Sequence, residues 1–474
     1  MKVLLINPSL DIEKIFGKFG KFMEPMPCIG LAYIAAMLEK NNIDVRVIDD
    51  FALRKGLKHI LEVIKEYKPD VVGISCLTPA YPSVQKIAEE IKKYDKSIKI
   101  VLGNLHATLF ADDILKNRVA DFVVHGEGEY TTLNLVKALE KGGEIKNVKG
   151  ISFLEGGQFV KTENAPFIEN LNDLPIPAWH LFPYKKYGLF PIATIKRPIL
   201  TVLGSRGCPH RCTFCALEYM GKKYRKRSPK NIADEIEFLM ENFSVKQIGF
   251  VDQSFPFLKD HAMEFCDEMI GRGLNKKVIW TSETRVDSVD KELLQKMKEA
   301  GCRRIMYGIE SGVQELLDRI KKNFKLEDVR RAVRESKEAG LETVGFFMLG
   351  LPGENMEMTR QTIDFAKSLD LDFAKFAITI PLPGSEIFEN KIKEGKLKPS
   401  NWEAFSTLDP KTSDVTCISE GMSREEMIKT LNRATFEFYV RPKTIFNLLL
   451  KVRTVELKYF LYAAYVYFSS KFNA

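Results

Sequence analysis

Short apolar runs alternate with amphipathic segments through the first third of the chain. The apolar runs cover residues 2–6, 44–49, 70–77, 99–104 and 121–129. The segments between them place apolar residues at helical spacing, as in "SVQKIAEEIKKY". This alternation is typical of βαβ units on a parallel sheet. We therefore predict a doubly wound, Rossmann-like or flavodoxin-like α/β domain over residues 1–145, with its ligand site at the carboxyl ends of the strands.

The pattern changes over residues 146–198. The stretch "NLNDLPIPAWHLFPYKKYGLFPI" contains four prolines and many aromatic residues. Its apolar residues follow neither the period of a helix nor that of a strand. Such composition predicts a linker that packs on its neighbours.

A second alternation follows and predicts six β/α units over residues 199–405. The apolar runs are "ILTVLGSRGC", "QIGFVDQ", "VIWTSETR", "RIMYGIESG", "TVGFFMLGLPG" and "FAKFAITIPLPG". Six units are fewer than the eight of a closed barrel, so we predict a partial, open (β/α)6 barrel of TIM type. Chemistry in such barrels lies on the loops after the strands.

Residues 406–474 are predicted to be a helical, basic and aromatic region. From Arg441 to the end there are six Lys or Arg residues and one acidic residue. No stretch approaches the ~20 apolar residues that span a bilayer. Two interpretations stay open: an aromatic helix packed on the barrel, or a basic amphipathic helix lying on a membrane surface.

Length and charge place only weak limits on the number of domains and on the kind of partner. A chain of 474 residues corresponds to two or three domains. Lys and Arg exceed Asp and Glu by 71 to 63, a mild excess that a solvated surface explains, and we expect no nucleic-acid partner. The N-terminus lacks a signal-peptide pattern, so we expect a cytoplasmic protein, with peripheral membrane contact as an option.

Three of the eight cysteines fall within "GCPHRCTFC", as Cys208, Cys212 and Cys215. Iron–sulfur clusters are usually held by four thiolates, and structural zinc also takes four ligands. Three thiolates on one loop can bind three corners of a [4Fe–4S] cube and leave the fourth iron open to another ligand. A zinc site completed by His210 is the alternative, but His210 is only two residues from each flanking cysteine, which is a poor chelate.

This spacing, with Phe214 before the last cysteine, resembles the signature of the radical S-adenosylmethionine superfamily. The resemblance implies that the three cysteines are catalytic and hold a [4Fe–4S] cluster. It implies that the amino and carboxylate groups of S-adenosylmethionine chelate the open iron. An electron from the reduced cluster then cleaves the sulfonium and releases a 5′-deoxyadenosyl radical.

The resemblance extends to later strand ends. It assigns Glu310 and Ser311 of "GIESG" to the ribose and methionine moieties, and Arg285 to the methionine carboxylate. It places Gly350 and Pro352 of "GLPGE" beside the adenine. Phe214 is taken as a further cofactor contact.

One further strand end, Asp252 and Gln253 of "VDQSF", is equally compatible with a site and a structural role.

A doubly wound domain before such a barrel resembles the cobalamin-dependent subfamily, and this resemblance covers about residues 1–400. The family motif Asp-x-His-x-x-Gly is absent, because residues 7–20 contain no histidine. Ser75 and Leu77 match Ser-x-Leu, and Gly103-Asn104 stands in place of Gly-Gly. The resemblance implies base-off cobalamin without a histidine ligand, its nucleotide tail near these four residues. The alternative is a domain that has lost its cofactor.

A nearby histidine, His106, is a candidate for lining that pocket, and an ordinary loop histidine is the alternative.

The leading hypothesis is a cobalamin-linked radical enzyme that methylates, cyclises or oxidises an unactivated carbon of a hydrophobic substrate such as a lipid or tetrapyrrole. A ferredoxin or flavodoxin would supply electrons. A methylthiotransferase acting on tRNA or a ribosomal protein would need three more N-terminal cluster cysteines, whereas only Cys28 and Cys76 precede residue 200. A corrinoid or iron–sulfur carrier would need neither "GIESG" nor Arg285.

Overall fold

The chain forms two compact units in a computed structural model. The model describes residues 1–10, 24–189, 193–397, 401–405, 417–418 and 420–442. The first unit comprises Met1–Tyr187, Ala216–Gly221 and Gly395–Phe405. The second comprises Gly188–Cys215, Lys222–Glu394 and the described residues after 405.

A seven-stranded sheet forms the centre of the first unit, in the order β2-β1-β3-β4-β5-β6-β7. Its strands are β1 (Lys2–Asn7), β2 (Asp44–Asp49), β3 (Val71–Ser75), β4 (Lys99–Gly103), β5 (Phe122–Val124), β6 (Ile151–Glu155) and β7 (Gln158–Lys161). The first five strands pair in parallel, and β6 and β7 pair antiparallel. These two antiparallel strands lie in the range that the sequence predicts as a linker, although the prolines on which that prediction rests all follow the hairpin.

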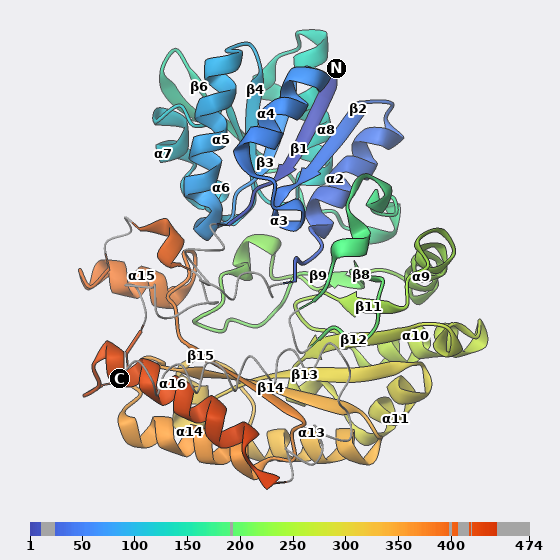
Figure 1. The fold of residues 1–474 in the computed structure, drawn as a ribbon, viewed down its shortest axis with the longest axis vertical. Coiled ribbons are helices and arrows are strands. Elements are labelled where there is room, and N and C mark those ends of the chain that lie inside the picture. The colour runs from blue at the N-terminus through green and yellow to red at the C-terminus, as the bar shows by residue number, and fades with distance from the viewer. Residues whose placement is uncertain (11–23, 190–192, 398–400, 406–416, 419, 443–474) are drawn as a thin grey trace. The chain divides into compact units, whose positions relative to one another are not determined.

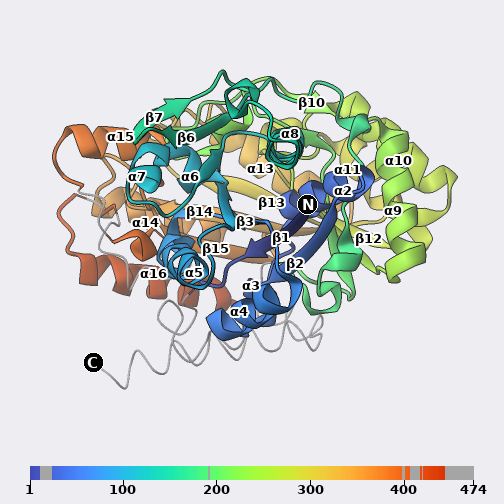
Figure 2. The same ribbon diagram turned by 90° about the horizontal axis from the view of Figure 1, so that it is seen from above.

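Helices cover both faces of this sheet. They are α2 (Ile29–Lys40), α3 (Asp50–Leu53), α4 (Gly56–Tyr67), α5 (Tyr81–Tyr94), α6 (Leu105–Leu109), α7 (Ala111–Lys116) and α8 (Gly128–Lys141). α2 and α8 lie on one face, and α4 and α5 lie on the other (Figure 1, Figure 2). Alternate residues of β1 divide between the faces: Leu4 and Ile6 join the core under α4 and α5. The predicted doubly wound domain is confirmed.

A six-stranded parallel sheet forms the centre of the second unit, in the order β15-β14-β13-β12-β11-β8. Its strands are β8 (Ile199–Val202), β11 (Gln247–Phe250), β12 (Ile279–Thr284), β13 (Cys302–Glu310), β14 (Glu342–Leu349) and β15 (Phe373–Ile378). A short antiparallel pair, β9 (Ser205–Arg206) and β10 (Arg225–Lys226), follows the first strand. The predicted partial barrel of six strands is therefore confirmed.

Most helices of this unit pack on the outer face of its sheet, whereas α15 lies apart from that face (Figure 1). The helices of the unit are α9 (Pro229–Phe243), α10 (Lys259–Gly271), α11 (Lys291–Glu299), α12 (Gln314–Arg319), α13 (Leu326–Glu338), α14 (Met356–Ser368), α15 (Glu386–Lys393) and α16 (Arg424–Tyr439). Trp280 of β12 contacts Phe265 of α10 on this face, with ring centroids 5.6 Å apart. Tyr307 of β13 bonds Ser336 of α13 at 2.8 Å. Because side chains alternate along a strand, the residues between these face the barrel interior.

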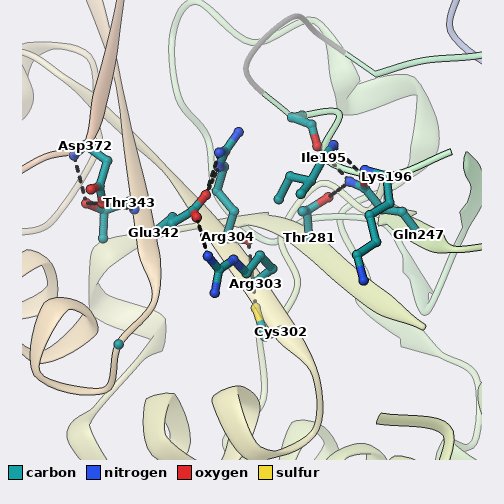
Figure 3. A network of polar contacts seen from close by, with 12 residues as sticks. Ile195, Lys196, Gln247, Thr281, Cys302, Arg303, Arg304, Glu342, Thr343 and Asp372 are labelled. Atoms are coloured by element: carbon teal, nitrogen blue, oxygen red, sulfur yellow. Dashed lines mark hydrogen bonds and ion pairs between the residues drawn. The ribbon is translucent and has the colours of Figure 1, made fainter. Parts of the chain in front are cut away.

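Polar residues occupy the interior near the amino ends of the strands (Figure 3). The fully buried Arg304 donates to the carboxylate of Glu342 from two nitrogens, at 2.9 and 2.5 Å, and Arg303 lies 2.9 Å from the same carboxylate. Gln247 accepts from the backbone N–H groups of Ile195 and Lys196 at 2.7 and 2.8 Å. These bonds close the end of the barrel away from the loops that follow the strands.

The predicted helical tail is described only as far as residue 442. α16 lies within that part and donates from the Tyr439 hydroxyl to the Ala374 carbonyl of β15 at 2.9 Å. Residues 443–474, on which the membrane-surface interpretation depends, lie outside the described residues. Among the described helices, none combines the length and the apolar character that crossing a membrane requires.

Candidate active site

The three clustered cysteines lie on one loop after the first barrel strand. Cys208, Cys212 and Cys215 are half-buried, whereas Cys266 and Cys302 of the same unit are fully buried. The loop turns back on itself through a bond from the Cys215 N–H to the Cys212 carbonyl at 3.0 Å. Solvent thus reaches the three thiols that the sequence assigns to a cluster.

Backbone bonds hold this loop against two later segments of the barrel. The Thr213 N–H donates to the Ile320 carbonyl at 3.1 Å, and the Ile387 N–H donates to the Thr213 carbonyl at 3.0 Å. Because these bonds use main-chain atoms, they fix the loop whatever the cysteines bind.

The start of the loop is fixed by Asp252, which follows β11. Its buried carboxylate accepts from the Gly204 N–H at 3.0 Å and from the Ser205 hydroxyl at 2.5 Å. Burial raises the pKa of Asp252 to about 6, although both hydrogen bonds oppose that rise. These two bonds give Asp252 a structural role in holding the loop, and the half-buried Gln253 makes no such bond in the described structure.

A buried ion pair stands beside the cysteine loop. Glu310 and Lys322 lie 2.8 Å apart, with both side chains buried. Glu310 ends β13 at a break in its register with β14, and its φ of +67° turns the side chain inward. A Cβ at position 308 would lie 2.7 Å from the Glu310 carboxylate, so a larger residue there would displace that carboxylate.

Cations gather near the thiols. Burial raises the pKa of the Cys212 thiol, and the charges of Lys322 and Arg285 act against that rise. The Lys322 ammonium lies 5.5 Å from the ring centroid of Phe214 on the cysteine loop. Positive charge at this point favours thiolates over thiols.

Arg285 follows β12, and its guanidinium is hydrogen-bonded to other groups of the protein. Its guanidinium makes two 2.8 Å bonds to Asp287 and one 2.5 Å bond to the Lys322 carbonyl. Ser311 is fully buried and bonds Thr362 at 3.1 Å. Both residues stand at the strand ends where the sequence expects them, already oriented by their neighbours.

The turn "GLPGE" is shaped by the chain itself. Gly350 has a φ of +82°, and a Cβ there would lie 2.3 Å from the backbone carbonyl oxygen of Cys417. Glu354 accepts from the Leu351 N–H and the Thr359 hydroxyl, both at 2.7 Å, and thereby closes the turn. Pro352 is exposed on it.

Polar residues of the first unit line the carboxyl edge of its sheet. Asn104, with a φ of +79°, donates to the Ser75 hydroxyl at 3.1 Å. A Cβ at Gly103 would meet no atom nearer than 3.9 Å. Leu77 is 47% exposed, which is unusual for a leucine next to a buried strand. The four residues that match the cobalamin motifs are thus brought together at one edge.

His106 is enclosed by aromatic rings rather than lining open space. It is fully buried between Tyr81, Phe110 and Trp402, with ring centroids 4.3, 4.7 and 4.7 Å away. Its Nδ1 lies 3.4 Å from Thr78, and burial lowers its pKa to about 3.

Two domain families match this chain in the order that the structure shows. The B12 binding domain matches residues 19–136, and the radical SAM superfamily matches residues 202–366. An uncharacterised methyltransferase of Pyrococcus horikoshii is 33% identical over 94% of each chain. An anaerobic magnesium-protoporphyrin IX monomethyl ester cyclase of Rubrivivax gelatinosus is 31% identical, covering 86% of this chain and 73% of the cyclase. The chain belongs to the radical SAM enzymes that carry a B12-binding domain.

The fold agrees with solved members of this family. The radical S-adenosylmethionine methyltransferase TsrM from Kitasatospora setae, solved with cobalamin and a [4Fe–4S] cluster, has a TM-score of 0.72, 18% identity, and coverage of 93% of this chain and 89% of its own. At that identity the likeness shows the fold.

Radical SAM chemistry fits the cysteine loop described above. No three Cys, His, Asp or Glu side chains in the described ranges converge on a point where one metal ion would bind. A [4Fe–4S] cube does not require such convergence, because each thiolate binds a different iron. The loop supplies three separate, solvent-reachable thiols, and the open fourth corner explains why no fourth cysteine accompanies them.

Sequence reasoning missed Lys322 and the cluster around Asp49. Lys322 meets Glu310 only through the fold, and no local pattern marks it. Asp49 accepts from Asn7 at 2.9 Å and from the Tyr187 hydroxyl at 2.5 Å. Asn7 and Asp49 each end a parallel strand. A search for polar residues at strand ends, which drew attention to Asp252, could therefore have found them.

Proposed function

We propose that this radical SAM enzyme is a cobalamin-dependent methyltransferase that methylates an unactivated carbon of a hydrophobic substrate such as a lipid or tetrapyrrole. The observation that supports this most strongly is the presence, on one chain, of the half-buried triad Cys208, Cys212 and Cys215 and of the hydrogen-bonded pair Ser75 and Asn104 at the carboxyl edge of the first sheet. The relative of P. horikoshii, similar over nearly its whole length, is named a methyltransferase.

The residues of the second unit would bind the cluster and S-adenosylmethionine. Cys208, Cys212 and Cys215 would hold the [4Fe–4S] cluster, which when bound supplies the electron that cleaves S-adenosylmethionine. Asp252 holds the start of the loop, and Glu310 presents a buried carboxylate oriented by Lys322. Glu310, Ser311 and Arg285 would bind the ribose and methionine moieties.

The first unit would bind cobalamin along the carboxyl edge of its sheet. The open space at Gly103 and the bonded pair Ser75 and Asn104 suit a nucleotide tail. The Asp-x-His-x-x-Gly motif is missing and His106 is enclosed by aromatic rings, so we expect base-off cobalamin with no imidazole from either place.

Ring cyclisation is a second candidate, because the magnesium-protoporphyrin cyclase is 31% identical over most of this chain. A hopanoid C-3 methylase of Methylococcus capsulatus, 26% identical over 83% of this chain, favours methylation of a lipid. Both relatives act on large hydrophobic molecules by name, which supports the proposed substrate class.

Anaerobic reconstitution with iron, sulfide and hydroxocobalamin tests the proposal. We expect cluster absorbance, a base-off cobalamin spectrum, and formation of 5′-deoxyadenosine or methylcobalamin from S-adenosylmethionine under reduction. Methylcobalamin labelled from methyl-labelled S-adenosylmethionine would support methyl transfer. A protein that binds cobalamin and iron but never consumes S-adenosylmethionine would contradict it.

A further inference from the structure

Lys375 of β15 lies on the inner face of the barrel sheet. Phe373, two residues earlier on the same strand, places its ring centroid 4.4 Å from the guanidinium carbon of Arg304 in the barrel interior. Side chains two positions apart on a strand share a face, so Lys375 also points inward. Its register partner on β14 is the half-buried Phe346. An ammonium group thus stands beside an aromatic residue inside the barrel.

Glu283 of β12 lies on the same inner face. Thr281, two residues earlier on that strand, accepts from the Gln247 side chain at 3.4 Å within the barrel interior (Figure 3). Glu283 is exposed, whereas its chain neighbours Ser282 and Thr284 are buried. Solvent therefore reaches the interior of the barrel at the level of Glu283.

The charges of these two residues influence each other. Desolvation raises the pKa of Glu283, and the Lys375 ammonium group opposes that rise. Burial lowers the pKa of Lys375, and the Glu283 carboxylate opposes that fall. Since lost hydration disfavours the charged form of each group, a bound group of opposite charge would stabilise the charge that it meets.

Apolar side chains share the inner face with this pair. Phe346 and Met348 of β14 and Ala377 of β15 are half-buried. Met348 and Ala377 are register partners, two residues beyond the pair of Phe346 and Lys375. This part of the interior therefore combines apolar surface with one ammonium and one carboxyl group, which suits an apolar molecule that carries a single charged group.

A carboxylate is the charged group that both residues can bind. An ammonium group has three donors, so Lys375 can bind an anion in addition to the contacts it makes within its own chain. With a pKa of about 7, the Glu283 carboxyl group is protonated in part of the molecules at neutral pH, and a protonated carboxyl group donates one hydrogen bond. A carboxylate, with two oxygens, accepts from both residues.

We propose that Lys375 and Glu283 form the polar end of the substrate site and bind a carboxylate of an otherwise apolar substrate. This inference rests on the proposed function and narrows it, because an uncharged lipid would place only apolar groups against the half-buried ammonium. Both residues belong to the second unit, so the site is built within the barrel itself. Lys375 then determines specificity for an acid over its neutral analogue.

Binding to the reconstituted full-length protein tests this inference. The probes are protoporphyrin IX and palmitic acid, each compared with its methyl ester, because esterification removes the negative charge and keeps the apolar body. Lys375→Met removes the ammonium group and keeps a long apolar side chain. Lys276→Met, at an exposed lysine of the same unit, is the matched control. Glu283→Gln keeps a hydrogen-bond donor at the second position. Equilibrium dialysis measures the affinity for each probe.

We expect the wild-type protein to bind at least one acid about 10-fold or more tightly than its ester, since hydrogen bonds to charged groups are the strong ones. Lys375→Met should lose this preference and bind the ester as the wild type does, which shows that the apolar part of the site is intact. Lys276→Met and Glu283→Gln should keep the preference.

Two results overturn the inference. One is a wild-type protein that binds neither acid more tightly than its ester, absence of binding included. The other is a preference for the acid that survives in Lys375→Met. A wild-type protein that forms no cluster or never consumes S-adenosylmethionine overturns the proposed function instead, and the acid-to-ester ratio does not depend on that result.

Discussion

Each of the three loop cysteines is exposed enough to serve as a ligand, whereas Cys266 is fully buried against the barrel core. Replacing Cys208, Cys212 or Cys215 with Ala should abolish the iron–sulfur absorbance and S-adenosylmethionine cleavage, because two thiolates do not hold the cube. Iron content and 5′-deoxyadenosine formation after anaerobic reconstitution measure this. Cys266→Ala is the control and should keep both. A loop variant that cleaves at the wild-type rate would refute the assignment.

The carboxyl group of Glu283 has a raised pKa. It lies on the inner face of β12, it is exposed, and among the described residues it makes no hydrogen bond or ion pair. Desolvation, aided by the Glu310 carboxylate and opposed by the Lys322 and Lys375 ammonium groups, raises the pKa of Glu283 from 4.5 to about 7.

The sign of its effect follows from this rise. The folded state binds the Glu283 proton more tightly than the unfolded chain does, so protonation of Glu283 contributes to the free energy of unfolding. This contribution is complete below pH 4.5 and is lost as the pH rises through 7. Glu283→Gln should therefore raise the Tm by roughly 2 °C at pH 8 and leave it nearly unchanged at pH 4.5. Thermal unfolding of both proteins across this range measures the difference. An equal shift at all pH values would show that the carboxylate does not titrate as described.

At the scale of elements, one buried ion pair joins neighbouring barrel strands. Arg304 of β13 and Glu342 of β14 are paired in the sheet register, and their side chains are 0% and 5% exposed (Figure 3). Arg304→Ala leaves the Glu342 carboxylate buried without its main partner and should cost about 3–5 kcal/mol of unfolding free energy.

Chemical denaturation measures this cost. The double variant Arg304→Met with Glu342→Leu is the matched comparison, because replacing both charges with apolar groups of similar size avoids an unpaired charge and should cost much less. Arg303 would lose its partner at the same time, but it is half-buried and remains hydrated. If the single and double variants unfold alike, the pair contributes through packing alone.

At the scale of the whole molecule, the residues proposed to bind cobalamin and those proposed to hold the cluster belong to different units. Ser75→Trp should block cobalamin binding, because the indole would fill the space beside Asn104 and Gly103. Cluster absorbance should be unchanged, since the cysteine loop belongs to the other unit. Titration with hydroxocobalamin and the iron–sulfur spectrum give the two measurements. Loss of both cofactors together would point to general misfolding.

Local patterns along the chain are enough to predict the fold class and to group the three loop cysteines. Alternating strands and helices, and three cysteines at close spacing, are local patterns that remain visible however the chain folds. They were sufficient to predict the parallel sheets of both units and the three cysteines as one group. The residues matched to the cofactor contacts stay predictions, and the structure shows where they stand.

The tertiary structure decided which polar residues meet. Lys322, in the turn after α12, reaches Glu310 at the end of β13. Asp252 reaches Gly204 because parallel strands bring the ends of β8 and β11 to one edge of the sheet. The structure also explains why residue 350 is a glycine. A Cβ at that position would collide with the backbone carbonyl of Cys417. The strands β6 and β7 were not predicted. They extend the edge of an existing sheet, and two such short strands need only a weak local pattern. Such contacts depend on residues far apart in the chain, so no period along the sequence records them.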